Sequence, residues 1–110
     1  MGVVHTLEST AIFGLGNVND SPSQDADYGY STYNEAIIPV VMNYWISFVR
    51  DLSPNRYKFA SAPHWESFGD GHDGGRRIRL QTNATAMELI PQDQLARCEF
   101  WKGLGRVMEE

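Results

Sequence analysis

The sequence has little cysteine and little positive charge, and each shortage excludes a class of structure or partner. Its 110 residues include a single cysteine, Cys98, so an internal disulfide bond is impossible. Asp and Glu number 14 against 9 Lys and Arg, which gives a formal net charge of −5. Nucleic acids and anionic membranes bind basic patches, so we expect neither as a partner.

Patterns for membrane insertion, secretion and metal binding are also lacking. No apolar run approaches the length of a membrane span, so we expect no transmembrane segment. The first residues do not form the pattern of a signal peptide, a positively charged segment followed by an apolar stretch. The sequence therefore assigns the protein to no particular compartment. Asp70, His72 and Asp73 stand close together, but such a Gly-rich run is typical of a solvated turn. We therefore expect no metal ion and no cofactor.

What is present fits one small globular domain over residues 1–110. Hydrophobic residues make up 42% of the chain, well above the level of disordered proteins. The β-branched Val3 and Val4 predict that residues 2–5 are the end of a buried strand. Residues 15–31 are rich in Gly, Asn, Asp and Ser, which predicts a loop.

A helix is predicted after this loop. Thr32 and Glu35 have the spacing of a capping box. Pro39 either kinks the helix or is its first residue. Residues 53–55, Ser-Pro-Asn, end it. The apolar residues that recur at helical spacing, and predict its buried face, are Ile37, Val41, Tyr44, Trp45, Phe48 and Leu52.

A hairpin and a second helix are predicted in the last third. Residues 77–82 alternate between apolar and polar, and residues 85–90 pair with them across Asn83-Ala84. The helix covers about residues 92–108 and follows Pro91. Its predicted apolar ridge consists of Leu95, Cys98, Trp101, Leu104 and Met108.

These elements do not make an obvious stand-alone fold. A strand fragment has nothing to pair with, and an isolated hairpin is marginally stable in water. The helices carry more apolar and aromatic surface than such a remnant covers. The chain is therefore interpreted as part of something larger. The alternative is a small non-catalytic interaction protein whose exposed aromatic helix faces bind a partner.

The order of motifs resembles one enzyme family. The stretch GVVHTLESTAIFG (2–14) is similar to the histidine segment of type-B carboxylesterases, the group that includes cholinesterases and fungal extracellular lipases. VMNYWISFVRDLSPN (41–55) resembles the family's Tyr-Trp helix, and WESF (65–68) a later Trp-containing segment. RIRLQT (77–82) resembles a late strand, and RCEFWKGL (97–104) the final Cys-x-Phe-Trp helix. The matches follow one another in the family's order.

This resemblance implies the C-terminal portion of an α/β-hydrolase fold, with the last core strand, two amphipathic helices and a small hairpin. It implies hydrolysis of a carboxylic ester by a Ser-His-Glu triad, in which His5 is the general base. Glu8 matches the glutamate after the histidine and is given a supporting structural role, since the triad acid of the family lies upstream. Thr6 stands where glycine is usual, which restricts the backbone if that position needs a positive φ.

The catalytic serine is missing from this sequence. No G-x-S-x-G nucleophile elbow occurs in the 110 residues, and the matching triad acid is absent as well. Triad members act as a unit, so the chain alone is predicted to be inactive. The ester is then a substrate of the full-length parent, and a complementing N-terminal fragment is a candidate partner.

Asn83-Ala84-Thr85 has the form of an N-glycosylation acceptor on the predicted hairpin turn. Secretion is common in the resembled family, which makes Asn83 a possible glycosylation site in a secreted parent. The leading hypothesis is thus a C-terminal carboxylesterase segment, and the alternative is the interaction protein.

Overall fold

The computed structural model describes residues 6–18, 28–69 and 75–108, and for residues 106–108 the backbone alone. The strand predicted at residues 2–5 lies outside this part of the chain. The contacts divide the chain into two compact units. The first unit comprises residues 1–64 and 80–86, and the second comprises residues 65–79 and 87–110.

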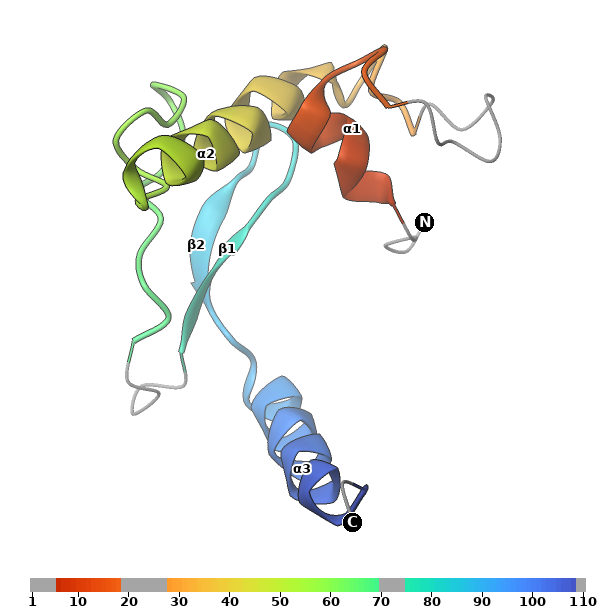
Figure 1. Ribbon diagram of the computed structural model, residues 1–110, viewed down its shortest axis with the longest axis vertical. Helices are drawn as coiled ribbons and strands as arrows, with labels where there is room; N and C mark the ends of the chain where they lie inside the picture. Colours follow the sequence, from red (N-terminus) through yellow and green to blue (C-terminus); the bar gives the residue numbers. More distant parts are fainter. Residues whose placement is uncertain (1–5, 19–27, 70–74, 109–110) are drawn as a thin grey trace. The chain divides into compact units, whose positions relative to one another are not determined.

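The first unit is built on helices. They are α1 (Leu7–Phe13), the short 3-10 helix η1 (Glu35–Ile37) and α2 (Ile38–Asp51). Helix α1 packs against α2 (Figure 1). The buried apolar cluster joins α1, the loop before η1, η1 itself and α2; its members are Ala11, Tyr30, Ile37, Ile38 and Val41.

Helix α2 begins differently from the predicted capping box. The α-helix starts at Ile38, so Pro39 lies in its first turn, where its missing N–H costs no hydrogen bond. Thr32 caps no helix: its hydroxyl donates to the Gly29 carbonyl oxygen at 3.3 Å. Glu35 instead opens η1, and the capping-box prediction was wrong. A local turn that uses the threonine hydroxyl competes with helix capping.

The C-terminal end of α2 is fixed by a buried serine. Leu52 ends the helix with a left-handed backbone at φ 51°. The Ser47 side chain is fully buried; its hydroxyl donates to the Ser53 carbonyl oxygen at 2.7 Å and accepts the Tyr57 N–H at 2.9 Å. One hydroxyl thus satisfies two backbone groups of the chain that leaves the helix.

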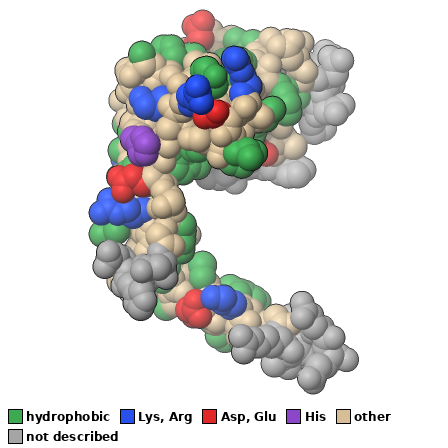
Figure 2. All heavy atoms as spheres, turned by 60° about the vertical axis from the view of Figure 1, so that its left-hand side comes forward, with side chains coloured by type: hydrophobic (Ala, Val, Ile, Leu, Met, Phe, Trp, Pro, Cys, Tyr) green, Lys and Arg blue, Asp and Glu red, His purple; other side chains and the backbone are tan. Residues whose placement is uncertain are grey.

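The buried stripe predicted for α2 is present only in part. Val41 and Tyr44 are buried, as the spacing predicted. Phe48 and Leu52 are 54% and 83% exposed, and Ser47 takes the buried position in that part of the helix. Hydrophobic side chains therefore reach the surface of the first unit, among Lys and Arg side chains (Figure 2).

The second unit contains β1 (Arg76–Arg79), most of β2 (Ala86–Leu89), and helix α3 (Gln92–Met108). The two strands form the predicted antiparallel hairpin. Its polar face holds an ion-pair cluster: Arg77 Nε lies 2.8 Å from Glu88 Oε1, and Arg79 Nε lies 3.6 Å from Glu88 Oε2. Arg77 also donates to Gln94 Oε1 at 2.8 Å, which ties the strand to the first turn of α3.

Helix α3 begins where the sequence predicted it. The Pro91 carbonyl oxygen accepts the N–H groups of Gln94 and Leu95 at 3.0 and 3.1 Å. The predicted apolar ridge is not buried, because Cys98 is exposed and Trp101 is 64% exposed. Phe100 and Trp101 contact each other edge-on, with ring centroids 5.5 Å apart. In the parts of the chain that the structure describes, no helix combines the length and hydrophobicity needed to cross a membrane.

Candidate functional site

The segment around the predicted general base is described from Thr6 onward. His5 itself lies outside the described residues. The two residues singled out with it, Thr6 and Glu8, lie at the start of α1. No helix was predicted here from the sequence, whereas the structure has one of seven residues, a length that depends on tertiary packing for its stability. That packing is supplied by Ala11, which is buried against α2.

Thr6 adopts a backbone conformation that is costly for any residue with a Cβ atom. Its backbone is left-handed, at φ 67° and ψ 7°, and its carbonyl oxygen accepts the Ser9 N–H at 3.1 Å. A side chain with a Cβ is disfavoured in this region by roughly 1–2 kcal/mol. The position therefore favours glycine on physical grounds, and threonine fixes the backbone next to His5 at an energetic cost.

We expect Thr6→Gly to be more stable than Thr6→Ala. Both variants remove the threonine side chain and its interactions, but only glycine takes a positive φ freely, so the difference should be about 1 kcal/mol. Urea denaturation followed by circular dichroism measures it. Ser9 within α1 supplies the matched control, because there Ala should be better than Gly by about 1 kcal/mol. The same order at both positions would contradict the strain at Thr6.

Glu8 occupies the first turn of α1 and is exposed. A carboxylate there is favourable at the positive end of the helix dipole. Tyr30 lies close by: its hydroxyl donates to the Leu7 carbonyl oxygen at 2.9 Å. Burial, and to a smaller extent the Glu8 charge, raise the pKa of Tyr30, so this hydroxyl stays a donor at neutral pH. Glu8 thus lies in the exposed first turn of α1, close enough to Tyr30 for its charge to act on the tyrosine hydroxyl.

Tyr30 was not identified from the sequence. It lies in a loop, 23 residues from Leu7, and no local spacing links the two. Its buried ring packs in the cluster with Ala11, and its hydroxyl binds the backbone two residues after His5. A tyrosine in a Gly-rich loop was the available signal, and it does not indicate which backbone group the hydroxyl reaches.

The Phe13-Gly14 pair of the histidine motif ends α1. Gly14 has φ 88°, and its N–H donates to the Thr10 carbonyl oxygen at 2.9 Å. A Cβ added to Gly14 would lie 3.0 Å from the Met42 side chain of α2. The glycine therefore allows α1 to end at a residue with a positive φ and lets the backbone at this point lie close to α2. Phe13 is 61% exposed.

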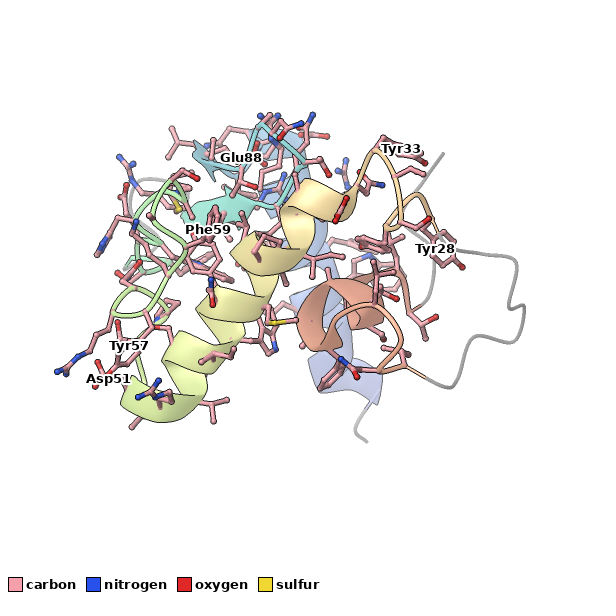
Figure 3. The ribbon with its side chains drawn as sticks, turned by 90° about the horizontal axis from the view of Figure 1, so that it is seen from above. Tyr28, Tyr33, Asp51, Tyr57, Phe59 and Glu88 are labelled. Atoms are coloured by element: carbon pink, nitrogen blue, oxygen red, sulfur yellow. The ribbon has the colours of Figure 1, made fainter. Side chains whose placement is uncertain are left out.

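The other histidines, and the charged and aromatic side chains at the end of α2, are far from this segment in sequence. His72 and its neighbouring aspartates lie outside the described residues. His64, with its Nε2 atom 3.4 Å from the Asn55 amide nitrogen, is an exposed residue in the loop after α2. Asp51 and Tyr57 lie at the end of α2 (Figure 3), where the Arg50 guanidinium stacks 4.3 Å from the Tyr57 ring centroid.

Within the described ranges, no group of three or more His, Cys, Asp or Glu side chains is arranged to hold a metal ion. Asn83 is exposed in the turn between β1 and β2. Thr6 and Glu8 thus lie at the start of α1, in the stretch that directly follows His5. Tyr30 holds this end of the helix through its hydrogen bond to the Leu7 carbonyl oxygen.

Comparisons with known proteins give one informative match. No protein-family model matches the chain, and no curated protein matches it. Among solved structures, Aspergillus niger EstA matches with 51% sequence identity and a TM-score of 0.84. The match covers 99% of this chain and 20% of the EstA chain, so this chain spans about one fifth of the length of EstA. The chain is therefore a relative of EstA, a carboxylesterase/lipase-like protein, and corresponds to a segment of it.

Proposed function

We propose that this chain is the C-terminal part of a type-B carboxylesterase of the α/β-hydrolase fold, and that His5 is the general base of its Ser-His-Glu triad. The observation that carries the proposal is the 51% identity with EstA over 99% of the chain. At this identity the two segments share their local structure, and the histidine motif lies within the matched region.

The local geometry supports a positioning role for the residues after His5. In ester hydrolysis, the imidazole takes the proton of the serine as it attacks and returns it to the leaving alkoxide. Both transfers require a fixed imidazole, because small displacements of a catalytic group cost much of the rate. The left-handed Thr6 and the Tyr30-to-Leu7 hydrogen bond restrict the backbone immediately after His5. Glu8 supports this helix start and is not the triad acid.

The exposed apolar side chains are consistent with a segment of a larger fold. Phe48 on α2, Leu52 at the C-terminal end of that helix, and Phe100 and Trp101 on α3 are all more than half exposed. Such side chains are usually covered in a complete domain or an interface. The 51% identity with EstA over 99% of the chain favours an esterase segment over the rival function, an interaction protein that uses these faces.

The chain alone is predicted to have no esterase activity. Its sequence has no G-x-S-x-G, so a nucleophile activated by His5 is missing. The purified chain and its His5→Ala variant should hydrolyse p-nitrophenyl acetate and butyrate at the same background rate. Turnover that disappears in His5→Ala would mean that a serine within these residues acts as nucleophile, which would contradict the need for the elbow.

The direct test of the proposal is a chimera. The matched fifth of EstA is replaced by these 110 residues, and hydrolysis of p-nitrophenyl butyrate is compared with that of EstA itself. We expect the chimera to fold and to retain activity within about tenfold, since half of the exchanged residues are identical. A folded chimera with only background activity would contradict the proposed role of the segment.

A further inference from the structure

The turn between β1 and β2 presents an asparagine outward. Asn83 is exposed and has a left-handed backbone, at φ 60°, a conformation that asparagine tolerates better than most residues. The Ala84 N–H donates to the Gln81 carbonyl oxygen at 3.0 Å and closes the turn. The Thr85 hydroxyl donates to the Gln81 carbonyl oxygen at 2.9 Å and accepts the Gln81 N–H at 3.2 Å. The turn is therefore held by its backbone and by Thr85, and the Asn83 side chain is not needed to close it.

The same turn is anchored to the rest of the first unit. The Thr82 hydroxyl donates to Asn34 Oδ1 at 2.7 Å, and Asn34 Nδ2 donates to the Tyr28 carbonyl oxygen at 2.8 Å. One asparagine side chain thus links the turn to the loop before η1. These bonds use the side chains of Thr82 and Thr85, on either side of Asn83, and the Asn83 side chain takes part in none of them.

There is open space next to Asn83. A hollow of about 360 Å³ has Asn83, Ala84 and Thr85 on one side and Ile37, Val40 and Phe59 among its other lining residues. Phe59 lies in the loop after α2 (Figure 3). A sugar has both hydroxyl groups and an apolar ring face, and the lining of this hollow is likewise part polar and part apolar. The folded unit therefore has room for the innermost sugar of a glycan on Asn83.

We propose that Asn83 is a site of N-linked glycosylation when the chain passes through a secretory compartment. Asn83-Ala84-Thr85 supplies the acceptor sequence. In the transfer, Asn83 Nδ2 forms a bond to the anomeric carbon of an N-acetylglucosamine carried on a lipid pyrophosphate. The bond from that carbon to the phosphate oxygen breaks, the lipid pyrophosphate leaves, and the amide loses one proton. The co-substrate is thus a lipid-linked oligosaccharide. This proposal is independent of the esterase assignment.

The experiment is secretion of the full chain from yeast behind a heterologous signal sequence, with intact-mass analysis before and after peptide N-glycosidase F. A second sequence of the same form, Asn19-Asp20-Ser21, lies outside the described residues, so every protein tested carries Asn19→Gln. We expect one glycan on this background, its complete loss in Asn83→Asp and in Thr85→Ala, and its retention in Thr85→Ser. Asn83→Asp keeps the shape of the side chain and the tolerance for a left-handed backbone.

Two results would overturn the proposal. One is an unmodified chain on the Asn19→Gln background, while a reporter with a known acceptor sequence is glycosylated in the same cells. The other is a glycan that persists in Asn83→Asp. Because transfer takes place on the chain as it enters the compartment, a variant that folds poorly still reports on the acceptor sequence. For the folded background protein, peptide N-glycosidase F should also remove the glycan without precipitation, as expected for an exposed turn.

Discussion

In the chimera that carries these 110 residues within EstA, His5→Ala is expected to lower kcat for p-nitrophenyl butyrate by about 10⁶-fold. Losing the histidine of a triad costs about as much as losing the whole triad, since the serine is then no longer deprotonated as it attacks. KM should change little, because the imidazole acts mainly in the transition state. Initial rates over a range of substrate concentrations separate the two constants.

Two matched variants control this experiment. His64→Ala removes an exposed histidine whose neighbour is Asn55, and we expect kcat to change less than twofold. Glu8→Gln removes the charge at the start of α1 but keeps the shape of the side chain, and we expect a several-fold loss at most. A loss in Glu8→Gln as large as that in His5→Ala would mean that Glu8 is a member of the triad, which the proposal denies. A fully active His5→Ala chimera would rule out His5 as the base.

Tyr44→Ala is expected to lower the free energy of unfolding of the chain by about 3–5 kcal/mol, the usual cost of truncating a large buried aromatic. Tyr44 is 0% exposed, and its hydroxyl donates to the Pro63 carbonyl oxygen. Small domains are stable by roughly 5–15 kcal/mol, so this one substitution removes a large part of the total. Urea denaturation followed by tryptophan fluorescence measures the change.

The Tyr44→Phe variant separates ring packing from the hydrogen bond. It keeps the ring and leaves the Pro63 carbonyl oxygen without this donor, so we expect a loss of about 1–2 kcal/mol. Burial raises the pKa of Tyr44, so the hydroxyl is protonated and donates at neutral pH. Val49→Ala, at a 78% exposed position of the same helix, should stay within about 0.5 kcal/mol of the parent. Equal losses in Tyr44→Ala and Val49→Ala would contradict the placement of the core.

The elements predicted correctly from the sequence are those fixed by nearby residues. The hairpin followed from the alternating run at 77–82 and the partner stretch at 85–90 across Asn83-Ala84, and α3 from Pro91 and the helical spacing after it. Signals of this kind act within a few residues, so they can be read from one sequence. The capping box at Thr32 failed because the same hydroxyl closes a turn with Gly29, and spacing does not distinguish these two uses.

What depends on contacts distant in the sequence was not predicted. Helix α1 exists through its packing on α2 and the hydrogen bond from Tyr30, a partner 23 residues from Leu7. The buried side of α2 followed the spacing at Val41 and Tyr44 but not at Phe48, because burial is decided by what covers a helix face. For the candidate site, His5 and Glu8 came from the resemblance to a family, and the role of His5 stays a prediction.

For Thr6, the sequence predicted a restricted backbone if the position needs a positive φ. The resemblance indicated that glycine is usual there, and a positive φ is the physical reason for such a preference. The structure gives Thr6 φ 67°. The signal lay in a residue that departs from the pattern, which a composition or periodicity analysis would not detect.

The ion pairs around Glu88 have a consequence for the order in which the second unit opens. Arg77 bonds both Glu88 and Gln94, so the first turn of α3 is tied to the hairpin. Farther along, the pairs Arg97–Asp93 and Lys102–Glu99 lie within the helix itself and are exposed, so they add little. Amide hydrogens of α3 should therefore exchange more slowly near Gln94 than near residue 105, because opening at Gln94 must also break the Arg77 hydrogen bond. Without the hydrogen bond from Arg77 to Gln94, α3 could also unwind from its first turn.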